Sequence, residues 1–132
     1  MIDQIVLRQA FRVILGGVSG LPTARAWENR SFIPPNPPMN WVRETHLPAV
    51  ERQISDGMVE AVGVMQYDLF TPAGNGTEAI EALAHAVKTA FKPKTAPAVN
   101  IIIDRAECGA GRPDPPWYFI PVRLTYRAYA AL

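Results

Sequence analysis

The first hydrophobic pattern along the chain is that of a helix. Apolar residues within 2–15 recur with a 3.6-residue period and cover about half of the helix circumference, whereas one packed face needs only about 100°. Either this helix is wedged between a sheet and a second helix, or it also contacts a partner subunit. Gly16 and Gly17 then end it. The apolar positions are Ile2, Val6, Leu7, Ala10, Phe11, Val13 and Ile14.

A second helix is predicted from about Thr77 to Phe91. Thr77 is a suitable N-cap residue, and Pro93 prevents continuation of the helix. Its apolar stripe has the width expected of a single packed face. The stripe consists of Ile80, Leu83, Ala84, Val87 and Phe91.

The clearest strand pattern runs from Met58 to Thr71. Alternate residues from Val59 to Leu69 lie on one face, while Glu60, Gln66 and Asp68 lie on the other face together with Val62 and Val64. A strand of about this length exceeds the usual 5–6 residues, so we expect a bend or a projecting hairpin. Gly63 is a candidate position for a β-bulge.

Other segments predict shorter strands. Trp41–Leu47 and Val50–Ile54 form either a strand pair or one broken strand, and Ser55-Asp56-Gly57 is a turn signal. Pro121 removes a backbone donor from the last strand, which favours an edge strand or a bulge. This order of elements predicts an α+β fold: one domain, residues 1–132, with a mostly antiparallel sheet and both helices on one face. The remaining strands are Ala24–Glu28, Val99–Asp104 and Tyr118–Tyr126.

Composition adds one unusual feature, the 13 prolines among 132 residues. This is about twice the average usage. The prolines indicate stiff connections, above all an extended arm from Phe32 to Met39 and a loop from Glu107 to Trp117. Rigid connections lose less entropy on assembly. We therefore expect the arm, the loop or both to contact another protein.

Charge and cysteine content argue against several classes of protein. The net charge is +1, so a specific nucleic-acid partner is not expected. The single Cys108 excludes an intrachain disulfide and has no neighbouring Cys or His to make a metal or redox motif. No stretch approaches the ~18 apolar residues of a membrane helix. We expect a soluble protein made in a cytosol, with no membrane partner.

No catalytic pattern emerges from the sequence, and no metal or cofactor is expected. Motifs for nucleotide binding, zinc proteases and nucleophile elbows are absent. His46 and His85 have no recognisable catalytic partners, so surface or cap roles are expected. An alternative function is a ligand-binding module or small enzyme with an aromatic pocket between sheet and helices. Its lining would be Trp27, Trp41, Trp117, Tyr67 and Tyr118.

The predicted outward face of the strands mixes both signs of charge. Such a face is either solvated or paired with a neighbour, where mixed charges set register and specificity. Together with the wide apolar arc of the first helix, it favours a self-assembling interaction protein. The outward residues are Arg43, Glu44, Arg52, Gln66, Asp68, Arg123, Thr125 and Arg127.

One segment carries a family resemblance. Ala24-x-Ala26-Trp27-Glu28-Asn29-x-x-Phe32-x-Pro34-Pro35 precedes the Trp41 strand, and Gly63-Val64-Met65-Gln66-Tyr67-Asp68-Leu69 follows it. With the Pro72–Gly76 loop and the Ala-rich helix, this resembles the lambda-type phage tail terminator, or tail completion, proteins over about residues 3–129.

The resemblance implies a structural virion protein of the phage tail without catalysis. Proteins of that family form a hexameric ring at the head-proximal end of a long tail tube, stop its polymerisation and meet head-completion proteins. The expected partners are therefore a second copy of the chain, the tail tube protein and the head-completion (connector) protein. We predict the contact residues from the stiff connections and the outward arginines: Phe32, Pro34, Pro35, Pro37, Pro38, Arg43, Arg52, Arg112, Trp117, Arg123 and Arg127.

Overall fold

The computed structural model describes residues 3–36, 39–91, 95–96 and 101–131. The two helices are α1 (Gln4–Gly16) and α2 (Glu78–Ala90). The strands are β1 (Arg25–Ala26), β2 (Trp41–Ser55), β3 (Met58–Pro72), β4 (Thr95–Ala96), β5 (Ile101–Cys108), β6 (Arg112–Asp114) and β7 (Trp117–Ala131).

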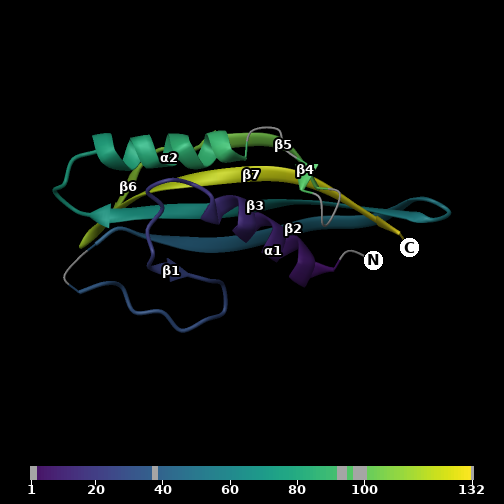
Figure 1. The fold of residues 1–132 in the computed structure, drawn as a ribbon, viewed down its shortest axis with the longest axis horizontal. Helices are drawn as coiled ribbons and strands as arrows, with labels where there is room; N and C mark the ends of the chain where they lie inside the picture. The colour runs from purple at the N-terminus through teal and green to yellow at the C-terminus, as the bar shows by residue number, and fades with distance from the viewer. Residues whose placement is uncertain (1–2, 37–38, 92–94, 97–100, 132) are drawn as a thin grey trace.

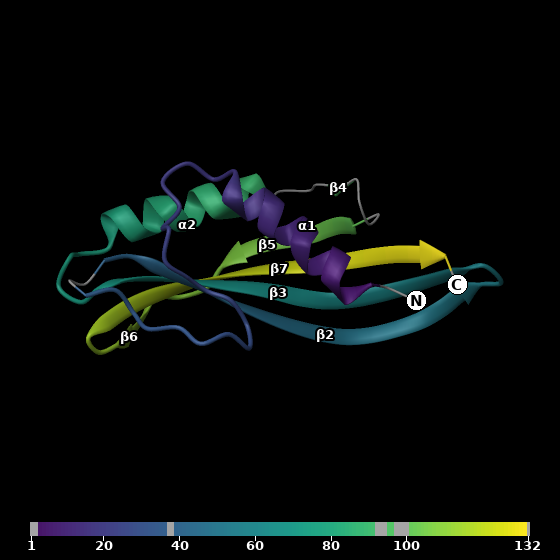
Figure 2. The same cartoon turned by 60° about the horizontal axis from the view of Figure 1, so that its bottom comes forward.

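All seven strands belong to one sheet, with β6 paired to β7 beside the path β1-β2-β3-β7-β5-β4. Within the described residues, only the β1–β2 pair is parallel. Both helices cover the same face of this sheet (Figures 1 and 2). The predicted α+β class, with a mostly antiparallel sheet and two helices on one face, is confirmed. We call the covered side the helix face and the opposite side the open face.

Strands β2 and β3 form a long hairpin that projects beyond α1 and the chain termini (Figure 1). The two segments predicted before Ser55 are therefore one strand, interrupted by a register shift between Pro48 and Val50. Gly63 lies opposite Pro48 at this irregularity. A Cβ on Gly63 would lie only 2.7 Å from the Tyr126 hydroxyl, so a larger residue would displace that ring. The predicted projection is confirmed.

The last strand corrects one expectation, because β7 is central rather than at an edge. Pro121 pairs with Asp68 of β3, and its carbonyl accepts a 2.8 Å hydrogen bond from the Gly109 amide on the other side. Since the nitrogen and carbonyl of one strand residue point to the same side, the missing donor faces the break between β5 and β6. There the ladder is already interrupted, so the proline costs no regular strand hydrogen bond.

Several element boundaries also differ from the predictions. The strand predicted at Ala24–Glu28 is only two residues long, and β5 continues to Cys108. The predicted 107–116 loop therefore begins in β5 and contains β6. Thr77 is the N-cap of α2 but makes no side-chain cap hydrogen bond. The start of the strand predicted at Val99 lies outside the described residues.

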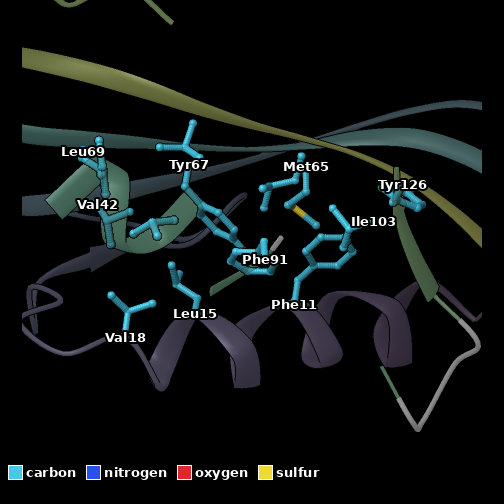
Figure 3. Packing of buried hydrophobic residues seen from close by; sticks show 14 of the residues in the cluster. Phe11, Leu15, Val18, Val42, Met65, Tyr67, Leu69, Phe91, Ile103 and Tyr126 are labelled. Carbon is cyan, nitrogen blue, oxygen red and sulfur yellow. The ribbon is translucent and has the colours of Figure 1, made fainter. Parts of the chain in front are cut away.

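The main core fills the space between the helices and the helix face (Figure 3). Phe11 of α1 stacks on Phe91 at 5.6 Å and meets Tyr126 of β7 edge-on at 5.4 Å. However, Ile5 and Val13 of α1 remain 69% and 77% exposed. One arc of the first helix therefore packs inward as predicted, while Ile5 and Val13 have no cover within the described chain, and the predicted contact with a partner subunit stays a prediction.

Candidate assembly surfaces

The open face carries a row of polar side chains across β2, β3 and β7. Arg43 donates to Asp68 at 2.8 Å, and Gln66 donates to the other Asp68 oxygen at 2.8 Å. Arg123 in turn donates to Gln66 at 3.2 Å. Asp68 is almost fully buried in this row although it lies on the open face. Four of the predicted outward residues, Arg43, Gln66, Asp68 and Arg123, thus form a connected network rather than isolated solvated charges.

A second polar row lies nearer the hairpin tip. Arg52 and Tyr129 both donate to Glu60, Tyr129 at 2.8 Å, and this hydrogen bonding lowers the pKa of Glu60. Arg127 donates to Tyr129 and holds Asp104 through both oxygens at distances down to 2.8 Å. The hydrogen bond to Asp104 raises the pKa of Arg127. These contacts join β2, β3, β7 and β5.

Between the two polar rows lies an apolar band on the same face. Leu47 pairs with Val64 and Val50 pairs with Val62 across the hairpin, so the four side chains are neighbours. Leu47 is 51% exposed and Val50 is 56% exposed, and the two valines of β3 are half-buried. An exposed apolar group with a polar rim is typical of an interaction surface. We call these four residues the hairpin band.

The other end of the open face holds an aromatic cluster. Trp41 stacks on Phe70 at 3.9 Å, meets Trp117 edge-on at 5.7 Å and contacts Phe32 at 4.9 Å. Phe119 stacks on Phe70 at 4.9 Å. Two of the residues predicted to meet a partner, Phe32 and Trp117, are therefore used within the protomer. Phe32 anchors the start of the proline-rich arm on its own sheet.

The helix face contains a buried ionic network that the sequence did not predict. Glu44 was expected to face outward, but its side chain is fully buried under α1, and Arg12 donates to both of its oxygens at 3.1 and 2.7 Å. The Tyr67 hydroxyl donates to the same carboxylate at 3.3 Å. The correction follows from strand alternation, because Arg43 and Glu44 cannot share a face. The Glu44 hydrogen bond raises the pKa of Arg12.

His46 adjoins this network and is also buried, which corrects the expected surface or cap role. Its Nε2 is 2.5 Å from the hydroxyl of Tyr126, and its backbone amide donates to Glu28 at 3.2 Å. Burial lowers the pKa of His46 and raises that of Tyr126 to about 12. The contact between His46 and Tyr126 links β2 to β7 on the helix face. Neither ring is joined to a Ser or Cys nucleophile by any hydrogen bond among the described residues.

A shallow groove runs along α1 on its outer side. It has a volume of about 480 Å³ and lies between the helix and the Glu28–Arg30 turn. Its walls are held by the Arg8–Glu28 ion pair at 3.0 Å and by the guanidinium of Arg12, which lies 4.3 Å from the centre of the Trp27 ring. Asn29 has a positive φ of 59°, which shapes the turn. The groove is therefore built from both α1 and the segment after β1.

The predicted contact residues do not form one patch. Arg43, Arg52, Arg123 and Arg127 lie on the open face, and Arg112 of β6, which pairs with Phe119, lies on the same face at its aromatic end. Pro34 is exposed and Pro35 half-buried, while Pro37 and Pro38 lie outside the described residues. The predicted set does not include the hairpin band. Its signal was present, because Val62 and Val64 are apolar on the face that also carries Gln66 and Asp68.

The aromatic residues of the alternative function do not converge on a pocket. Tyr67 is buried on the helix face, whereas Trp41 and Trp117 belong to the cluster on the open face. Trp27 packs against Arg12, and only Trp117 and Tyr118 share a hollow, an apolar one of about 290 Å³ between the 72–77 and 113–118 segments and outside the space between sheet and helices. The space between sheet and helices is occupied by core side chains. The described residues thus do not form the predicted ligand pocket.

Among the described residues, no cluster of His, Cys, Asp and Glu side chains could hold a metal ion. In the same part of the chain, neither helix has the length and hydrophobicity needed to cross a bilayer.

Fold and surfaces together define a small α+β protein with a long hairpin, an exposed apolar band on the open face of its sheet and a groove beside α1. Comparison with protein families then gives the particular family. A family model described as phage tail terminator protein matches residues 6–126. The chain belongs to the phage tail terminator family, which is a family of structural proteins of the phage tail.

Comparison with solved structures supports the fold. One matching solved structure has a TM-score of 0.71 and is 21% identical, with 97% of this chain and 96% of that chain covered. At this identity the likeness supports the fold alone. No curated protein matches the chain.

Proposed function

We propose that this protein forms a closed ring, hexameric as in the family it resembles, on the head-proximal end of the phage tail tube. The ring ends polymerisation of the tube and presents a surface to the head-completion protein. Partners are a second copy of the chain, the tail tube protein and the head-completion protein. Its place is the virion tail, after assembly in the host cytoplasm.

The observation that carries this proposal is the hairpin band. A soluble protomer gains nothing from exposing Leu47 and Val50 beside two valines at the middle of a long hairpin. Burying one such side chain stabilises a complex by about 1.5–3 kcal/mol. The polar rows on either side can then set the register of the partner, because charged rims act on specificity and association rate. A neighbouring protein that covers this band accounts for both features.

The test combines particle assembly with tail length. Purified protein, alone and with isolated tail tubes, is examined by light scattering and negative-stain imaging, and tails are measured in lysates of a phage that lacks the gene. We expect rings on tube ends, and overlong tubes when the protein is missing. Leu47→Ser with Val50→Thr should form fewer rings on tube ends and should leave tubes overlong. Ala82→Ser, on the exposed side of α2, should form rings and restore normal tube length. Tubes of normal length without the protein would refute the proposal.

A further inference from the structure

Two exposed features at separate places on the protomer complement each other in shape and charge. The first is the tip of the β2–β3 hairpin, residues 54–58, and the second is the groove beside α1. We propose that the hairpin tip of one copy docks in the groove of the next copy around the ring. This inference rests on the proposed ring and specifies which surfaces close it.

The hairpin tip is apolar and acidic. Ile54 and Met58 are 44% and 42% exposed at the extreme end of the molecule, beyond α1 (Figure 1). Asp56 lies between them in the turn and forms no ion pair among the described residues. The hairpin from 47 to 64 carries Glu51, Asp56 and Glu60 against one Arg52, a net charge of −2.

The groove has the opposite character. Arg8, Arg12 and Arg30 line it together with one acid, Glu28, and the buried Glu44 behind Arg12 leaves a net charge of +1. Arg8 and Arg12 are already paired, whereas Arg30 has no acidic side chain within ion-pair distance in the described part of the chain. Ile5, 69% exposed, supplies an apolar wall. The hairpin tip fits this groove, because Ile54 and Met58 can contact the apolar wall at Ile5 while the Asp56 carboxylate pairs with Arg30.

The arrangement requires a second copy rather than an internal contact. The tip points away from the body of its own chain, so it cannot fold back into the groove beside its own α1 (Figures 1 and 2). A projection and a groove on different parts of one surface make a heterologous contact. Such contacts propagate from copy to copy and close into a ring when the rotation permits. The 480 Å³ groove lies within the range of pockets that enclose small groups, which suits a two-residue turn with its flanking side chains.

Cross-linking tests the proposed pairing directly. Cys108, the exposed free cysteine, is first replaced by Ser. Ile5→Cys and Met58→Cys are then introduced together and singly, and assembled rings are oxidised and separated on a denaturing gel. We expect a ladder of covalent oligomers from the double variant only, because a heterologous contact places residue 5 of one copy beside residue 58 of the next. Rings without a ladder would overturn this pairing and leave the proposed function intact.

Charge exchange gives a second, independent readout. Asp56→Lys and Arg30→Glu each place like charges at the contact, and the double variant restores opposite charges. We expect each single variant to weaken self-association by about tenfold or more and the double variant to recover most of it. Asp56→Asn, which keeps a turn-forming residue, should give a smaller loss. Equal ring formation by all variants would overturn the inference, and absence of rings from wild-type protein, on tubes as well as alone, would overturn the proposed function with it.

Discussion

The buried Glu44–Arg12 pair makes the sharpest prediction about stability. Glu44→Ala removes a fully buried carboxylate that accepts two hydrogen bonds from Arg12 and one from Tyr67. The Tyr67 hydroxyl is then left buried without that acceptor, and the Arg12 guanidinium loses its counter-charge. Breaking a buried pair in this way costs about 3–5 kcal/mol. Domains of this size have a total stability of only about 5–15 kcal/mol.

The matched control is an exposed pair of similar geometry. Asp104 accepts bonds from Arg127 at distances down to 2.8 Å, but the two side chains are 34% and 39% exposed. Asp104→Ala should therefore cost only about 0.2–1 kcal/mol. Urea unfolding followed by circular dichroism at neutral pH measures both changes.

A double variant separates the buried charge from its packing. Arg12→Met with Glu44→Leu replaces the pair by apolar groups of similar size, so we expect it to recover much of the stability lost in Glu44→Ala. Because Arg12 also forms a wall of the groove beside α1, this variant should fold but assemble poorly. If Glu44→Ala costs no more than Asp104→Ala, the reasoning from burial is wrong.

Three further predictions follow from other parts of the structure. Replacing Pro34, Pro35, Pro37 and Pro38 by Gly or Ser should weaken ring assembly and tail capping more than folding, and unchanged capping would contradict the proposed role of the arm. Burial lowers the pKa of His46 from 6.5, so the neutral side chain contributes its full stability above pH 6.5, and this contribution is lost as the pH falls through the lower folded-state pKa. His46→Gln should therefore make the free energy of unfolding depend less on pH in the acid range, as measured by chemical unfolding. Phe11→Ala should destabilise the fold by about 3–5 kcal/mol, since the ring is 1% exposed and lies between Phe91 and Tyr126. If Phe11→Ala lowers the urea midpoint less than Leu47→Ser does, the place of Phe11 in the core is contradicted.

The sequence by itself determined the elements whose signals are local. The helical period from Leu7 to Leu15 and the alternation from Val59 to Leu69 each follow from short-range geometry, so both elements lie where they were predicted. The same alternation placed the open-face residues correctly on β3 and β7. It also contained the apolar pattern of Val62 and Val64, which marks the hairpin band.

Only the tertiary structure decided which neighbours each strand has and where its polar groups find partners. Pro121 is tolerated in a central strand because its missing donor faces a break between β5 and β6, which depends on how the segment around Gly109 folds back onto β7. Glu44 is tolerated under α1 because Arg12, 32 residues earlier, supplies the counter-charge. The groove beside α1 likewise needs the turn after β1 to lie against a distant helix. These pairings are set by packing between distant segments, and local periodicity carries no information about them.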